Sequence, residues 1–187
     1  MLLYRVFPYL PGAEPGEPGH PLFLQPFQGT GRWDNPRSYL AAYLSSSPSG
    51  AIGETFAHLS TWRRPMLRVP TLAGAERRLG TYLLDEEVHP LLDLDDAKAL
   101  LARGIRPTEV VIRNRPRTQQ LAAAVFAEGV WAGLNWWSMH RPQWTLQALW
   151  AVDALVLHSV DPLPGHPGTL DAGRLLGKRL AADLAGP

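Results

Sequence analysis

The hydrophobic pattern begins with a short apolar run at residues 2–7, which is rich in strand formers and predicts an opening strand. Prolines and glycines then recur through residues 8–31 and predict a long surface flap, of a kind that is often functional or mobile. A second strand is predicted at residues 38–44. After the hydroxyl-rich turn at residues 45–49, apolar positions about four residues apart predict a helix that runs to about Trp62.

The rest of the chain alternates less regularly between strand and helix patterns. Further strands are predicted at residues 66–72, 79–84, 131–138 and 146–158. Further helices are predicted at residues 97–102, 116–128 and 170–184, the last of them amphipathic and packed on the outside. Gly104 and Gly129 stand where the first two of these helices should end. The order of elements lacks the strand–helix alternation of a doubly wound sheet and favours an α+β fold.

Composition limits the classes of protein to which the chain can belong. Its 187 residues fit one domain, and an apolar content of 45% is enough to close a core. Eighteen basic against seventeen acidic residues leave a net charge of +1, which gives no support for direct binding to nucleic acid or to a membrane surface. The chain has no cysteine and no long apolar segment, so we expect a cytoplasmic protein without disulfides. Its six histidines are scattered, and we expect no metal site.

Three positions carry candidate chemistry. In the Gly31-Arg32-Trp33 turn, a glycine permits close approach to a ligand, a guanidinium can hold phosphate or carboxylate, and an indole can wall a pocket. Tyr43 follows eleven residues after Arg32, and Glu54 follows eleven residues after Tyr43, in the first turns of a predicted helix. Each residue alone also has a structural interpretation: an exposed turn, a half-buried core tyrosine, and an acid that complements the helix dipole.

Taken together, the order and spacing of these residues resemble the RES domain family, which is named for its arginine, glutamate and serine. The opening strand of that family is matched by Tyr4-Arg5, its glycine-rich turn by Gly31-Arg32-Trp33-Asp34, and its next segment by residues 43–54. Ser138, which follows the predicted helix at residues 116–128 and a strand, is the counterpart of the family serine. The similarity covers about residues 2–155.

The resemblance implies an ADP-ribosyltransferase-like α+β fold with mixed and antiparallel sheets and flanking helices. We expect residues 1–160 to form the RES-like catalytic domain, and residues 161–187 to form a helical extension packed on it. The implied activity is cleavage of the nicotinamide–ribose bond of NAD, by hydrolysis, phosphorolysis or ADP-ribosyl transfer. NAD would be the substrate, with no cofactor. A DNA-binding antitoxin is the implied partner, and oligomerisation stays open.

The resemblance also implies a role for each site residue. Cleavage builds positive charge on the ribose, so Glu54 is expected to stabilise an oxocarbenium-like state. Arg32 would bind the diphosphate, Tyr43 would stack on nicotinamide, and Ser138 would position the ribose or the acceptor. His58, four residues after Glu54, would share its helical face and line the pocket, or be a structural histidine.

Two departures from the family pattern support a second hypothesis. Asp34 stands where the family usually has asparagine, and Ser138 follows two tryptophans instead of proline or alanine. A catalytically silent module that binds a nucleotide or a partner protein is therefore the alternative function. A third hypothesis is a carbohydrate-binding module, because five tryptophans fall within residues 131–150, although core packing is the commoner use of tryptophan.

Overall fold

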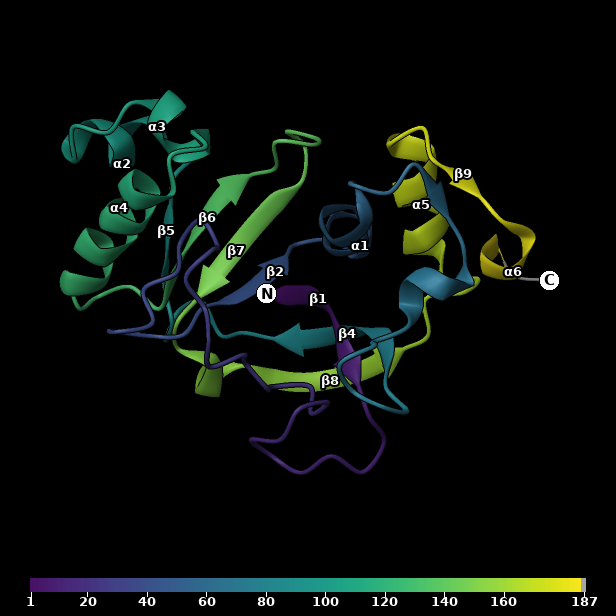
Figure 1. Ribbon diagram of the computed structural model, residues 1–187. Helices are drawn as coiled ribbons and strands as arrows, with labels where there is room; N and C mark the ends of the chain where they lie inside the picture. Colours follow the sequence, from purple (N-terminus) through teal and green to yellow (C-terminus); the bar gives the residue numbers. More distant parts are fainter. Residues whose placement is uncertain (186–187) are drawn as a thin grey trace.

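The computed structural model describes residues 1–185, which form a large sheet, a small sheet and flanking helices (Figure 1). The strands of the large sheet are β1 (Leu2–Tyr9), β2 (Ala42–Ser45), β4 (Glu76–Leu83), β5 (Leu91–Asp93), β6 (Gly133–Trp137), β7 (Thr145–Leu149) and β8 (Val156–Asp161). The small parallel sheet pairs β3 (Thr61–Trp62) with β9 (Arg179–Leu180). The α-helices are α1 (Pro48–Phe56), α2 (Ala97–Ala102), α3 (Pro107–Val111), α4 (Arg115–Ala127), α5 (Pro167–Leu175) and α6 (Ala182–Ala185). Two 3₁₀ helices, η1 and η2, cover Arg64–Leu67 and Val152–Ala154.

The large sheet has the strand order β5-β6-β7-β2-β1-β4-β8. The β5–β6 pair is parallel, and the other neighbouring pairs are antiparallel. Helices α2, α3 and α4 gather beside β5 and β6, whereas α1, α5 and α6 lie toward the opposite side of the molecule (Figure 1). This arrangement confirms the predicted α+β class, with a mixed sheet and flanking helices in one domain.

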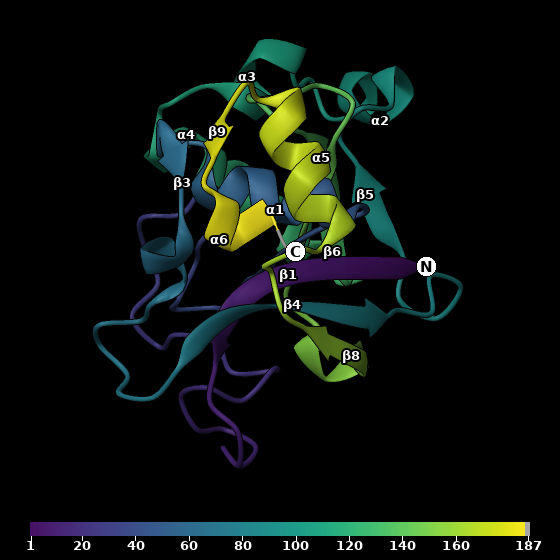
Figure 2. The same cartoon turned by 90° about the vertical axis from the view of Figure 1, so that its right-hand side faces the viewer.

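Helix α1 sits where the sheet and the C-terminal segment meet. Ser47 caps its N-terminus, because the Ser47 hydroxyl accepts a hydrogen bond from Gly50 N at 3.0 Å. One face of α1 packs along α5, and Ile52 and Phe56 are buried there with Ala172 of α5. Figure 2 shows α5 in front of α1 from the side. Residues after 161 thus complete the core around the helix that carries Glu54.

The apolar residues between α4 and the β5–β7 part of the sheet form another core cluster. Leu121 and Val125 of α4 pack there with Leu134 and Trp136 of β6. Trp33 is fully buried in the same cluster, with its ring edge-on to Trp136 at 5.4 Å between centroids. This cluster fixes the Gly31-Arg32-Trp33 turn against β6.

Several predicted elements are confirmed, and others need correction. The opening strand, the helix at 97–102, the helix at 116–128 and the long flap are present. The predicted strand at residues 66–72 is wrong: the end of η1 and a turn occupy this segment, which follows Pro65 and contains Pro70. The apolar run at 146–158 is two strands separated by η2.

The two remaining corrections concern helix lengths. Helix α1 ends at Phe56, not near Trp62, because the chain turns after Ala57 and Trp62 pairs in β3. The leucines from 170 to 184 do not form one helix, because Gly177 has a φ of +61° and the chain continues into β9 and α6. Nowhere in residues 1–185 is there a helix with the length and apolar character needed to cross a bilayer.

Candidate active site

A cavity of about 330 Å³ lies beside α1, over the centre of the large sheet. Strands β1, β2, β6 and β7, helix α1 and the flap all contribute to its walls. The lining residues are Tyr4, Arg5, Val6, Gln25, Gln28, Ala41, Tyr43, Leu44, Ala51, Glu54, Thr55, Trp136 and Leu146. This volume is at the small end of the range of about 300–1,000 Å³ that is usual for ligand pockets, so it fits part of a dinucleotide better than a whole one.

The Glu54 carboxyl group is held in the cavity wall by Ser138. The buried Ser138 hydroxyl donates a short hydrogen bond to Glu54 Oε1. Ser138 Oγ itself accepts hydrogen bonds from His140 N at 3.0 Å and from Arg141 N at 3.1 Å. With two donors behind it, the hydroxyl has its proton directed at Glu54, so Ser138 fixes the orientation of the carboxyl group.

The β6–β7 connection brings these two residues together, although they are 84 positions apart. Ser138 N donates to Trp144 O at 2.9 Å, which closes the turn after β6. Trp144 is buried, and its ring lies over Gly53 of α1, where a Cβ would clash with the ring. The glycine just before Glu54 thus permits the close approach of the turn that carries Ser138.

Tyr43 lines the cavity with its ring and ties its hydroxyl group to the Gly31-Arg32-Trp33 turn. The hydroxyl donates to Asp34 Oδ1 at 2.6 Å and accepts from Trp33 N at 2.9 Å. Burial raises the pKa of Tyr43, and the adjacent Asp34 raises it further. The Tyr43 hydroxyl is therefore held in its neutral form near neutral pH.

Asp34 is a buried organiser of the turn, 5% exposed. Its Oδ2 accepts from Gly29 N at 2.8 Å and Gly31 N at 2.6 Å, while Oδ1 accepts from the Tyr43 hydroxyl. A Cβ on Gly31 would clash with both Asp34 and the Tyr43 oxygen, so only glycine fits there. Gly31 thus serves the geometry of the turn and is not among the residues that line the cavity.

Arg5 of β1 supplies the positive charge of the cavity. Its Nη1 donates to Phe23 O of the flap at 3.2 Å, and burial lowers its pKa. Gln28 attaches the same flap to the residue that precedes β2, because Gln28 Nε2 donates to Ala41 O at 2.9 Å and Gln28 Oε1 accepts from Ala41 N at 2.8 Å. The flap predicted from prolines and glycines is thereby held as one wall of the cavity.

The structure does not place Arg32 in this cavity. Its guanidinium is bound by the end of α3, where Nη1 donates to Val110 O at 3.0 Å and to Ile112 O at 2.6 Å. It lines a second cavity instead, together with Arg113 and Arg115. Burial lowers the pKa of Arg32, and the charge of Arg115 lowers it further.

Two other predicted positions also need correction. Trp33 does not wall the cavity: it is a core residue that packs on Trp136. His58 is exposed and lies beyond the end of α1, so the shared helical face expected with Glu54 does not exist. Sequence reasoning missed Arg5, Gln25 and Gln28 as lining residues. The available signal is Arg5 in the Tyr4-Arg5 pair, which matches the opening strand of the family.

Comparisons with known proteins address the family and the fold of the chain. A family model described as the RES domain matches residues 3–171. This chain belongs to the RES domain family. The match to the RES domain includes Arg5, Arg32, Tyr43, Glu54 and Ser138, and it ends within α5.

A solved structure shares the fold of this RES domain. The chain is similar to a chain in the crystal structure of the M. tuberculosis MbcT–MbcA toxin–antitoxin complex, with a TM-score of 0.60 and 18% identity. The superposition covers 95% of this chain and 89% of that one. At this level of identity the similarity establishes a common fold. No curated protein matches the chain.

Proposed function

We propose that this RES domain cleaves the nicotinamide–ribose bond of NAD at the cavity beside α1. The observation that carries the proposal is the Glu54 carboxyl group, oriented by Ser138 in a cavity that also presents the Tyr43 ring and the Arg5 guanidinium. These groups match the parts of the substrate: an aromatic base, a ribose that becomes cationic, and an anionic diphosphate. Membership in the RES domain family adds support.

Each residue has a distinct part in the proposed reaction. The C–N bond between ribose and nicotinamide breaks, and nicotinamide leaves with the bonding electrons. The ribose then carries positive charge, which the carboxylate of Glu54 stabilises. Ser138 is a positioning residue that acts through Glu54, because its hydroxyl is already engaged with Glu54, His140 N and Arg141 N. An acceptor adds to the ribose and loses its proton. Water, phosphate and a protein side chain each remain open as that acceptor.

Arg5 replaces Arg32 as our candidate for the substrate diphosphate. Arg5 lines the Glu54 cavity, whereas Arg32 lines the second cavity. The Arg5 side chain makes its hydrogen bond to a backbone carbonyl, so its charge is not consumed by a carboxylate in the described ion pairs. Ring stacking by Tyr43 on nicotinamide is retained from the sequence-based hypothesis, because its ring lines the cavity.

Nicotinamide release by the purified protein tests the proposal. Wild type should release nicotinamide from NAD, and Glu54→Gln should lower the rate by about 100-fold or more, because it removes the stabilising charge but keeps the shape. The matched control is Glu87→Gln, which removes the same charge at an exposed position outside the cavity. Equal rates for wild type and Glu54→Gln would overturn the assignment.

The same assay separates cleavage from the alternative of a silent binding module. A silent module would bind ADP-ribose by calorimetry and release no nicotinamide. The substitution of Asp34 for the family asparagine gives less support to the silent module, because Asp34 shapes the turn and does not line the cavity. The change at Asp34 therefore affects the hydrogen bond that holds the Tyr43 hydroxyl, and it does not alter the groups that would contact the substrate.

We further propose that the protein acts as a toxin that an antitoxin protein holds in check. The support is the family and the shared fold with a chain of a toxin–antitoxin complex. Expression of wild type without an antitoxin should then arrest growth and deplete cellular NAD, and Glu54→Gln should relieve both effects. Growth arrest by the two proteins alike would separate toxicity from NAD cleavage and contradict this proposal.

A further inference from the structure

A third cavity, of about 260 Å³, lies between the flap and the turn that follows η1, and we call it the flap cavity. Most of its walls are apolar and come from β1, the flap and that turn: Phe7, Pro8, Pro18, Phe23, Val69 and Leu72. The other side chains in the walls are polar, and none of the lining residues is acidic. Such walls suit a flat ring that carries a few polar atoms.

The flap cavity adjoins the Glu54 cavity. Arg5 and Gln25 line both hollows, so the two meet at these side chains. The Glu54 cavity, at about 330 Å³, fits only part of a dinucleotide. The flap cavity, at about 260 Å³, is also smaller than the usual pocket for a whole ligand, which begins at about 300 Å³. The two cavities thus form adjoining compartments, each with room for one half of a dinucleotide.

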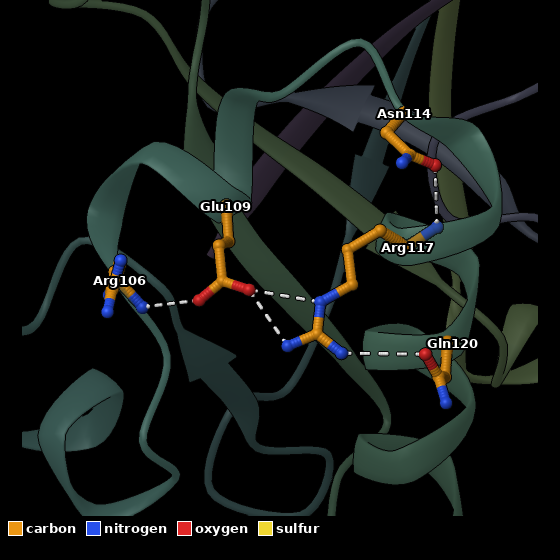
Figure 3. A network of polar contacts seen from close by, with 5 residues as sticks. All are labelled: Arg106, Glu109, Asn114, Arg117 and Gln120. Carbon is orange, nitrogen blue, oxygen red and sulfur yellow. Dashed lines mark hydrogen bonds and ion pairs between the residues drawn. The ribbon is translucent and has the colours of Figure 1, made fainter.

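Arg5 stands at the junction with its charge available to a ligand. Its Nη1 donates to the neutral carbonyl oxygen of Phe23 at 3.2 Å, and Arg5 takes part in none of the ion pairs within residues 1–185. Arg117 shows the opposite case, because its guanidinium donates twice to the Glu109 carboxylate, at 3.0 and 2.8 Å (Figure 3). The planar fork of a guanidinium that no carboxylate neutralises matches diphosphate oxygens. A cation therefore separates the two compartments, just as a diphosphate separates the two nucleosides of a dinucleotide.

The walls of the flap cavity are held in place by contacts within the protein. The Tyr82 hydroxyl of β4 donates to Pro21 O of the flap at 2.8 Å. The turn after η1 is closed by a hydrogen bond from Leu72 N to Val69 O at 3.0 Å, and the Val69 side chain is buried. The cavity is therefore formed without a ligand, as most small-molecule sites are.

We propose that the flap cavity binds the adenosine half of the dinucleotide substrate. The adenine ring packs on the apolar walls, and Arg5 binds the diphosphate that leads to the ribose at Glu54. The polar side chains of His20, Gln25 and Thr71 supply hydrogen-bonding groups for the ring nitrogens and the ribose hydroxyls. The identity of the ligand rests on the proposed function, whereas binding to the flap cavity is measured without turnover.

Calorimetry with AMP and with nicotinamide tests the flap cavity, because each probe represents one end of the substrate and neither is cleaved. The test variant is Phe23→Ala, which removes an aromatic wall and keeps the backbone carbonyl that Arg5 contacts. The matched control is Phe27→Ala, which makes the same change on the same flap at a side chain that is 94% exposed and lines neither cavity. Denaturation midpoints establish that each variant is folded. Phe23→Leu, which keeps an apolar side chain and removes the ring, serves if Phe23→Ala is unfolded.

The proposal predicts that Phe23→Ala weakens AMP binding by about fivefold or more, because contact between a base and an aromatic side chain contributes strongly to nucleotide affinity. Its affinity for nicotinamide should stay within about twofold of wild type, and Phe27→Ala should change neither affinity. Equal AMP affinities in Phe23→Ala and Phe27→Ala, or no AMP binding to wild type, would overturn the inference. Equal losses for both probes would show that Phe23 supports the whole site, and would overturn it too.

The two proposals fail in different ways. AMP binding that depends on Phe23, in a protein that releases no nicotinamide from NAD, would contradict the proposed function and support the flap cavity as a nucleotide site. Nicotinamide release by a protein whose AMP affinity is unchanged in Phe23→Ala would support the proposed function and overturn the role of the flap cavity.

Discussion

Tyr43→Phe isolates the contribution of one hydroxyl group to the turn that supports the site. The substitution keeps the ring that lines the cavity and removes an oxygen bonded to Trp33 N at 2.9 Å and to Asp34 Oδ1 at 2.6 Å. Both partners belong to nearly inaccessible residues, Trp33 at 0% and Asp34 at 5% exposure. Stranding one buried polar group costs about 1–3 kcal/mol, so two such groups cost about 2–6 kcal/mol. Water from the adjacent cavity can recover part of this cost, so we expect a loss of about 2–3 kcal/mol.

Urea unfolding at pH 7.5 measures this loss as a shift in midpoint at constant slope. Tyr4→Phe is the matched control, because Tyr4 lines the same cavity and its hydroxyl makes no hydrogen bond in the part of the chain that the structure describes. We expect the control to stay within about 0.5 kcal/mol of wild type, as surface substitutions usually do. A Tyr43→Phe protein as stable as the control would refute the bridging role of this hydroxyl.

Three further predictions address the elements around the site. Gly53→Ala should destabilise the fold by about 1–3 kcal/mol in the same urea assay, because a Cβ there collides with the Trp144 ring; an unchanged midpoint would contradict that packing. Gln28→Ala should speed proteolysis within residues 8–31, because it removes both side-chain bonds to Ala41, and equal digestion rates would show that the flap is held by other contacts. Burial lowers the pKa of His166 below its ordinary value of 6.5. The folded protein therefore binds a proton at His166 less readily than the unfolded chain does, so its stability is unaffected above pH 6.5 and falls as the pH drops below 6.5. Urea midpoints at pH 7.5 and 5.5 should differ less in His166→Asn than in wild type, and an equal difference would exclude this histidine as a cause.

Local signals in the sequence account for much of the fold. The strand at residues 2–7 and the helix at 116–128 carry clear patterns and end at recognisable breakers, so they form as predicted. The segment at 66–72 has the apolar character of a strand, yet Pro65 before it and Pro70 within it disfavour strand pairing, and the chain forms η1 and a turn there. Gly177 likewise divides an amphipathic pattern that continues across it, which periodicity alone cannot reveal.

The sequence predicts which residues belong to the candidate site better than it predicts where their side chains point. Spacing and resemblance pointed to Glu54 and Ser138, which the fold brings into direct contact. The direction of the Arg32 guanidinium depends on the carbonyl groups of residues 110 and 112, about eighty positions away, and no local pattern encodes them. Arg5 enters the cavity because β1 lies centrally in the sheet, a property of the strand order and not of the first strand itself.

A double-mutant cycle on nicotinamide release tests most directly the claim that Glu54 and Ser138 form one NAD-cleaving unit. The rates of wild type, Glu54→Gln, Ser138→Ala and the double variant are compared as kcat/KM with NAD. If Ser138 acts only through Glu54, the double variant should be no slower than Glu54→Gln alone. Losses that multiply would show that the two side chains act independently, and a wild-type rate in Glu54→Gln would show that the bond is not cleaved here.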